Sequence, residues 1–150
     1  MQNEMLNKIQ SQVEAKLSPG DHAAYRKIVV AGMKVMFDDA TFGEVMRQFN
    51  PERPAASLAN GIIGLGVLLF RKSKNTMPIA PAIAGLNTLM LHAIDFLDKA
   101  GKLRATPELV GEATSIYLET IMTKMGMTKE KMAGIIQQTQ QTAMQSKGAS

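Results

Sequence analysis

Apolar residues recur with helical spacing over the first third of the chain. Between residues 3 and 17 they step by three, four and four positions, which predicts an amphipathic helix. Its buried stripe is expected to be Leu6, Ile9, Val13 and Leu17. Ser18 followed by Pro19 suits the cap and first turn of a second helix, which should reach about Phe37. The buried face expected for the second helix consists of Ala24, Ile28, Ala31, Val35 and neighbouring residues.

A short third helix and a clear break follow. Thr41 and Glu44 have the spacing of a capping box, which predicts a helix over residues 42–49. Residues 50–54, Asn-Pro-Glu-Arg-Pro, should end it because residues before proline avoid the helical region. The N-terminal part, residues 1–50, is therefore expected to consist of amphipathic helices.

The middle of the chain carries two apolar runs. Residues 55–70 and 77–97 are nearly all apolar or small, and the polar residues 71–76 separate them. This pattern predicts a central, glycine-rich αα-hairpin within residues 55–100. Gly101 suits the C-terminal cap of its second helix.

The C-terminal part begins with a strong helix signal. Thr106 is a good cap, Pro107 fits the first turn, and Glu108 suits the positive end of the helix dipole. The apolar positions expected on this helix are Leu109, Ile116, Ile121 and Met125. Gly126 should end it, and Thr128 should cap a last helix that leads into a polar tail.

Together these elements predict an all-α protein of about six helices around the apolar hairpin. The three segments, residues 1–50, 55–100 and 106–150, are expected to form one domain, because 150 residues suit a single domain. Aromatic residues make up only 5% of the chain, and a β-sandwich or barrel normally uses more of them. Composition therefore excludes an all-β fold.

The first apolar run contains a ridge of small residues. Ser57 and Gly61 are four positions apart, as are Asn60 and Gly64, and this spacing lets another backbone approach closely. Each glycine weakens an isolated helix by roughly 1 kcal/mol relative to alanine, so a neighbouring helix, lipid or a second copy should compensate. We expect these four residues at a helix–helix or subunit contact. The glycines lack the context of a phosphate-binding loop or a dinucleotide fingerprint.

Residues that carry chemistry are few. The chain has no cysteine and two histidines, which excludes thiol catalysis, disulfides and cysteine-ligated metals. His92 and Asp95 have the spacing of a general base with its orienting carboxylate, but no nucleophile in a recognisable context stands nearby. The alternative is a buried histidine, or one at a subunit contact. We therefore expect no enzyme, no catalytic residue, no cofactor and no metal site.

The net charge of +4 comes entirely from the middle of the chain. Residues 55–106 hold six basic and two acidic residues, whereas the two signs balance on either side. The basic residues flank the apolar runs and are Arg71, Lys72, Lys74, Lys99, Lys102 and Arg104. A membrane surface, a nucleic-acid backbone or an acidic partner could bind them. The alternative is that they only mark helix ends, where they suit the dipole.

The two apolar runs are marginal as membrane spans. A spanning helix needs about 20 residues for a hydrocarbon core of about 30 Å, and residues 55–70 would cover roughly 24 Å. The run over residues 77–97 is long enough but carries His92 and Asp95, which are costly in lipid. Residues 1–17 lack the apolar run of a signal peptide. Conditional insertion after release from a soluble assembly fits this pattern better than permanent residence.

In general character the chain resembles the small internal virion proteins of short-tailed bacteriophages. The resemblance rests on the Ala-, Met- and Gln-rich helical composition, the lack of Cys and Trp, and the Gly-rich apolar hairpin over residues 55–97. It implies a protein that is packaged in the virion, leaves with the genome and helps to form a channel through the host cell envelope. It also implies other virion proteins, host membrane lipids and phage DNA as partners. No site residues are carried over.

Three functions follow as hypotheses. The first is a non-enzymatic, homo-oligomeric structural protein of a phage virion with latent membrane activity. The second is a holin-like membrane-permeabilising protein, which should enter the membrane fraction when expressed alone. The third is a basic helical nucleic-acid-binding module, whose affinity should fall steeply with salt.

Overall fold

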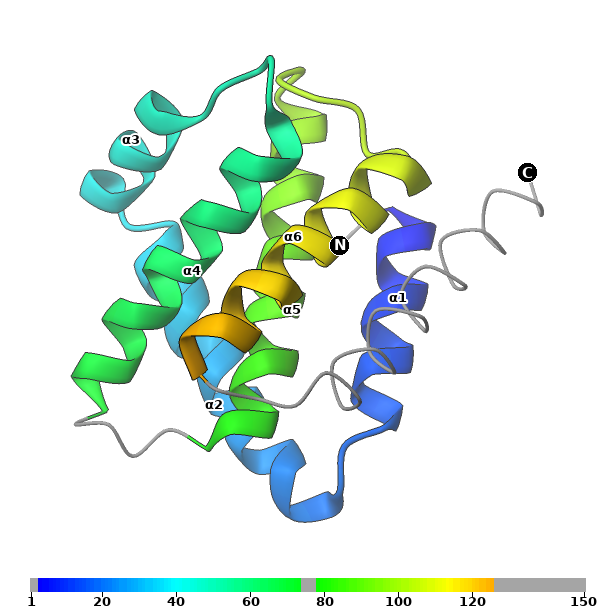
Figure 1. The fold of residues 1–150 in the computed structure, drawn as a ribbon, viewed down its shortest axis with the longest axis vertical. Coiled ribbons are helices and arrows are strands. Elements are labelled where there is room, and N and C mark those ends of the chain that lie inside the picture. Colours follow the sequence, from blue (N-terminus) through cyan, green and yellow to red (C-terminus); the bar gives the residue numbers. More distant parts are fainter. Residues whose placement is uncertain (1–2, 74–77, 126–150) are drawn as a thin grey trace.

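A computed structural model describes residues 3–73 and 78–125 (Figure 1). In this part of the chain every regular element is an α-helix, which confirms the all-α prediction. The helices are α1 (Glu4–Ala15), α2 (Pro19–Met36), α3 (Asp39–Gln48), α4 (Pro54–Lys72), α5 (Ile79–Lys99) and α6 (Pro107–Met125). The helix predicted to start at Thr128 lies outside the described residues.

Two predicted N-terminal caps are confirmed. The Ser18 hydroxyl accepts the backbone N–H of Asp21 at 3.3 Å at the start of α2. The Thr106 hydroxyl accepts the backbone N–H of Leu109 at 3.1 Å at the start of α6. Each cap satisfies one of the backbone donors that the first turn of a helix leaves without an intrahelical partner.

Gly101 ends α5 as predicted. Its φ of 74° lies in the left-handed region, which glycine adopts without steric cost. The N–H of Lys102 donates to the carbonyl of Leu97 at 2.9 Å, and the N–H of Gly101 donates to the carbonyl of Asp98 at 3.1 Å. These two bonds form a Schellman motif, which stops α5 and turns the chain back toward α6.

The predicted start of α3 is wrong. The helix begins at Asp39, whereas the spacing of Thr41 and Glu44 predicted a start at residue 42. Only Phe37 and Asp38 separate α2 from α3. Asp39 places a carboxylate in the first turn, where the positive end of the helix dipole favours it, so part of the expected break belongs to α3.

The buried face of α2 is rotated from the predicted one by about one residue. The buried residues are Tyr25, Ile28, Gly32 and Met36. Of the four residues named for this face, Ile28 is buried, Ala24 and Val35 are half-buried, and Ala31 is exposed. One residue corresponds to about 100° around a helix, so the shift turns Tyr25 and Gly32 toward α5.

Helix α5 lies in the middle of the bundle, with α4 and α1 on either side and α6 crossing it (Figure 1). It packs against α1, α2, α4 and α6, and the most extensive pairings are α2 with α5 and α4 with α6. The largest fully buried side chains of α5 are Ile83, Leu86, Leu89, Met90, Leu91 and Ile94. The core is therefore built around α5.

Candidate functional site

Two helices of the described chain, α4 and α5, are long and apolar enough to cross a membrane. At 1.5 Å per residue, the 19 residues of α4 span about 28 Å and the 21 residues of α5 about 31 Å. These lengths match a hydrocarbon core of about 30 Å. Helix α4 is longer than the apolar run that predicted it, because Arg71 and Lys72 continue the helix beyond the run. The apolar run itself, residues 55–70, still covers roughly 24 Å, so α4 reaches a membrane-spanning length only when Pro54, Arg71 and Lys72 are included.

The two helices differ in how far the fold covers them. Most of α5 is buried, whereas less than half of α4 is. Helix α4 lies on the outside of the bundle, where it packs mainly on α6 and also on α5 (Figure 1). The core helix of a soluble protein passes the same length and composition test, so α5 taken alone is such a core helix. The pair is distinctive because α4 also leaves a long face open.

The open face of α4 runs from Asn60 to the C-terminal end of the helix. Its exposed residues from Asn60 to Arg71 follow helical spacing and are Asn60, Gly61, Gly64, Val67, Leu68 and Arg71. Val67 and Leu68 are 38% and 39% exposed, which is high for large apolar side chains. We call these six residues the α4 stripe. Ser57 continues it but is half-buried, and its hydroxyl accepts the backbone N–H of Asn50 at 3.1 Å.

The predicted helix–helix contact of Gly61 and Gly64 does not occur within the described part of this chain. A Cβ atom added to either glycine would meet nothing within 4 Å. Gly61 and Gly64 therefore serve no close packing among the described helices. A contact of this ridge with a second copy of the chain stays a prediction.

Three other glycines allow the close helix packing instead. A Cβ at Gly66 would come within 2.7 Å of Leu86 Cδ1, so this glycine lets α4 approach α5. A Cβ at Gly85 would come within 2.8 Å of Ile28 Cγ2. A Cβ at Gly32 would likewise clash with the side chain of Leu89, so Gly32 and Gly85 both let α2 approach α5. Sequence reasoning missed Gly32 and Gly85, and it included Gly66 only as part of a motif.

The predicted basic residues form two separate groups at opposite ends of the bundle. Arg71 and Lys72 are exposed at the end of α4, at the lower edge of Figure 1. Lys99, Lys102 and Arg104 are exposed where α5 ends and the chain turns to α6, at the upper edge. The predicted site residue Lys74 lies outside the described residues.

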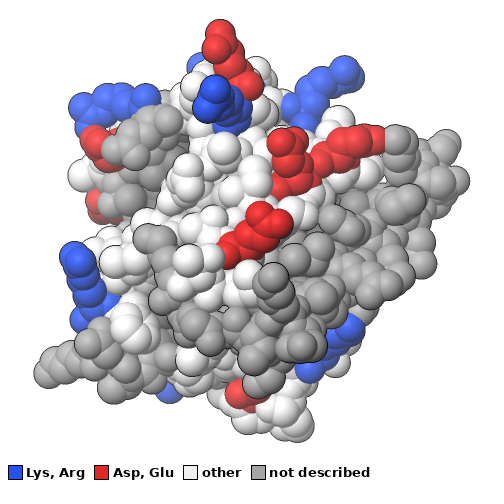
Figure 2. All heavy atoms as spheres, in the orientation of Figure 1, with Lys and Arg blue, Asp and Glu red and all other residues white. Residues whose placement is uncertain are grey.

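Because the two basic groups are separated by about the length of α5, they do not make one basic surface. In Figure 2 the Lys and Arg side chains stand apart from one another around the edge of the visible face. The two groups therefore lie at opposite ends of α4 and α5, whereas a track for a nucleic-acid backbone needs neighbouring basic residues along one face.

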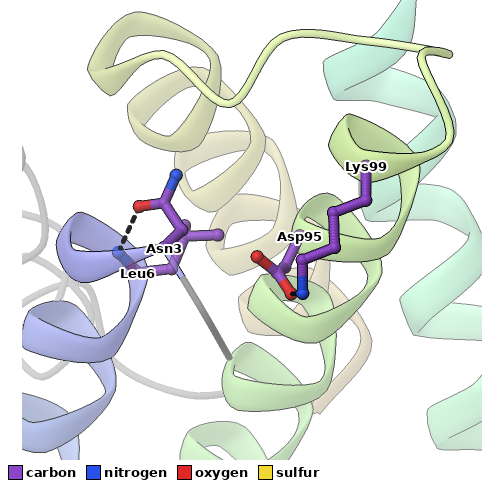
Figure 3. Close-up of polar contacts among 4 residues, drawn as sticks. All are labelled: Asn3, Leu6, Asp95 and Lys99. Atoms are coloured by element: carbon purple, nitrogen blue, oxygen red, sulfur yellow. Dashed lines mark hydrogen bonds and ion pairs between the residues drawn. The ribbon is translucent and has the colours of Figure 1, made fainter.

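Asp95 pairs with Lys99 (Figure 3). The Lys99 ammonium donates to Asp95 Oδ2 at 2.9 Å, one turn further along α5. Asp95 is buried, whereas His92 is only half-buried. The carboxylate that would have to orient His92 as a general base is therefore paired with Lys99. Close by, the start of α1 packs against α5, and Asn3 Oδ1 accepts the N–H of Leu6 at 3.1 Å.

Two buried tyrosines fasten neighbouring helices to α5. The hydroxyls of Tyr25 on α2 and Thr88 on α5 are 2.7 Å apart and share a hydrogen bond. The Tyr117 hydroxyl on α6 donates to the carbonyl of Ile83 at 2.7 Å. Burial raises the pKa of Tyr25 to about 12, and it raises the pKa of Tyr117 well above its ordinary value. Both tyrosines are therefore neutral cross-links between helices at physiological pH.

Two other buried polar side chains have no hydrogen-bond partner. The amide nitrogen and oxygen of Asn87 on α5 both lack one, as does the hydroxyl of Thr114 on α6. The side chains are 1% and 0% exposed. Buried polar groups are nearly always hydrogen-bonded, so this pair is an exception.

Within residues 3–73 and 78–125, no group of three or more His, Asp or Glu side chains could hold a metal ion. No known protein family, no curated protein and no solved structure matches the chain. The function has therefore to be inferred from the contacts and chemistry of the chain itself.

Proposed function

We propose that this chain is a non-enzymatic structural protein of a phage virion that stores α4 and α5 as a membrane-active hairpin. In this proposal it is packed with other virion proteins, leaves with the genome and helps to form a channel through the host envelope. The membrane activity is inferred from the way in which the bundle holds these two helices. Two helices of membrane-spanning length are held in a bundle by amphipathic helices, with one face of α4 open.

The charges of the hairpin fit such a role. If α4 and α5 crossed a bilayer, Arg71 and Lys72 would lie at one side, and Lys99, Lys102 and Arg104 would lie at the other. Each basic residue near anionic head groups contributes about 1 kcal/mol of attraction. Basic side chains at helix ends also reach the interface with their charged groups.

Two of the ionisable residues of α5, Asp95 and Lys99, lie near the end of the helix, where insertion costs less than at the bilayer centre. Lys99 is the last residue of α5, and Asp95 lies about 6 Å before it along the helix axis. The two side chains already form an ion pair on the same helix, so the pair would travel with α5. A paired charge near a helix end avoids most of the cost of a single charge at the bilayer centre.

Dye release from vesicles tests the membrane activity. The protein should release dye from vesicles that contain phosphatidylglycerol more readily than from vesicles of phosphatidylcholine alone, and less so at high salt. The double variant Lys72→Glu, Lys74→Glu should weaken the release. The matched control is Lys27→Glu with Lys34→Glu, two exposed positions on α2, which changes the net charge equally. Equal inactivity on both vesicle types would leave only the structural role.

A second measurement tests directly whether α4 enters the bilayer. Because the chain has no cysteine, a polarity-sensitive dye can be attached at Val67→Cys on the α4 stripe and, as control, at Val30→Cys on α2. Insertion should shift the emission to the blue at position 67 and leave position 30 in water. The same shift at both positions would mean that the protein adsorbs without inserting the hairpin.

The oligomeric and virion parts of the proposal have their own tests. The α4 stripe is the face on which a second copy would pack, because small residues let another helix approach closely. Light scattering should show an oligomer that Gly64→Leu disrupts.

Mass spectrometry should detect the chain in purified particles. A chain that enters the membrane fraction when expressed alone would favour the holin-like alternative. Binding that falls steeply with salt would favour the nucleic-acid module.

A further inference from the structure

The contact between α5 and α6 combines one good hydrogen bond with two polar side chains that have none. Tyr117 binds the carbonyl of Ile83 at 2.7 Å. Asn87 lies one turn after Ile83 on the same face of α5, and Thr114 lies one turn before Tyr117 on the same face of α6. Helices α5 and α6 run in opposite senses on either side of the turn at Gly101 (Figure 1), so a step of one turn from the Tyr117–Ile83 bond toward Gly101 leads to Asn87 on α5 and to Thr114 on α6.

Other threonines of the same two helices are satisfied. The hydroxyls of Thr120 and Thr123 on α6 donate to the carbonyls of Ile116 and Glu119, at 2.8 Å and 3.1 Å. Thr88, the neighbour of Asn87 on α5, shares its hydrogen bond with Tyr25. Asn87 and Thr114 therefore differ from these neighbouring threonines in that their side chains lack hydrogen-bond partners.

The contact between α5 and α6 is also the least extensive that α5 makes with the four helices it packs on. A buried polar group without a partner gives up its hydrogen bonds to water and receives nothing in return. The folded state therefore lacks hydrogen bonds at Asn87 and Thr114 that an opened state would regain from water.

We propose that the bundle opens first between α5 and α6, at Asn87 and Thr114, while α2 stays packed on α5. The opening hydrates the amide of Asn87 and the hydroxyl of Thr114, and it uncovers the face of α5 that Tyr117 binds. This inference does not depend on the proposed membrane activity. It predicts which contact gives way in the protein alone, in water.

Native-state hydrogen exchange tests this order of opening. In the unmodified protein α6 should lose its packing on α5 first and then open its own helical hydrogen bonds, so its amides should exchange faster than amides in the centre of α2. Thr114→Val keeps the shape of the side chain and removes the unpaired hydroxyl, and Asn87→Leu removes the unpaired amide. Each should slow the exchange of α6 about tenfold, because an unsatisfied buried group favours opening by about this factor or more.

The matched control is Thr88→Val, one residue from Asn87. It removes the partner of Tyr25 at the contact with α2, which stays closed when α6 opens. This variant should speed the exchange of α2 amides and leave α6 unchanged. The proposal is overturned if Thr88→Val speeds α6 as much as α2, because the bundle would then open only as a whole. It is also overturned if Thr114→Val leaves α6 exchange unchanged, and this variant decides the matter should Asn87→Leu fail to fold.

Discussion

Gly64 on α4 and Gly85 on α5 have opposite surroundings, so replacing each by alanine should change the stability differently. At Gly85 an added Cβ would lie 2.8 Å from Ile28 Cγ2 and 3.2 Å from Ile28 Cβ. Ile28 is β-branched, so its χ1 angle is restricted and its Cγ2 cannot move aside at little cost. At Gly64 the same Cβ would meet no atom within 4 Å. The two sites therefore differ in steric room and not in helical conformation.

The expected magnitude follows from two terms. Alanine gains about 1 kcal/mol over glycine in a helix, and this gain is common to both variants. Overpacking a well-packed core costs about 1–3 kcal/mol, and this cost applies only at Gly85. Gly64→Ala should raise the free energy of unfolding by about 1 kcal/mol. Gly85→Ala should then lie about 1–3 kcal/mol below Gly64→Ala.

Urea unfolding of dilute protein, followed by far-UV circular dichroism, measures both values. Dilution keeps copies apart, so that a subunit contact at Gly64 does not enter the comparison. If Gly85→Ala and Gly64→Ala raised the stability by the same amount, within about 0.5 kcal/mol, the close approach of α2 to α5 at Gly85 would be refuted. A lower stability of Gly64→Ala at high concentration only would instead indicate a contact between copies.

Two further predictions concern the buried tyrosines. Tyr25→Phe and Thr88→Val should each cost about 0.5–1.5 kcal/mol of unfolding free energy, because each removes the buried hydrogen bond between the two hydroxyls. The double variant should cost clearly less than their sum, and strict additivity in urea unfolding would contradict the bond. Since burial raises the pKa of Tyr25 to about 12, an unfolded chain loses this proton at lower pH than the folded one. Stability should therefore be full below about pH 10 and fall as the pH rises toward 12. Tyr25 and Tyr117 are the only tyrosines of the chain. Phenolate absorbance should thus appear together with the loss of helix, and its appearance near pH 10 with intact helices would contradict the burial of both rings.

Local chemistry made part of the fold predictable. A hydroxyl before a proline at the first turn marks the starts of α2 and α6, and Gly101 marks the end of α5. These signals act over three or four residues, so they are contained in the sequence window that reveals them. The start of α3 was missed because Asp38, Asp39 and Thr41 are all residues that occur at helix starts.

The packing could not be predicted in the same way. Gly64 and Gly66 are two residues apart, which corresponds to about 200° around the helix and places them on nearly opposite sides. The apolar run of α4 is apolar nearly all round, so its pattern does not show which side faces the core. The bond between Tyr25 and Thr88 joins residues 63 positions apart, and no local pattern signals it. The unpaired Asn87 likewise depends on which helix lies opposite.

The order of the helices along the chain has a consequence for synthesis. Helix α6, which covers α4, follows both apolar helices in sequence. The ribosome adds about 5–20 residues per second, so α6 is completed about one to five seconds after α5. During that interval the nascent chain presents apolar surfaces of α4 and α5 that the finished bundle buries. A chaperone, a nearby bilayer or a neighbouring nascent copy therefore competes with α6 for the same surface each time the protein is made.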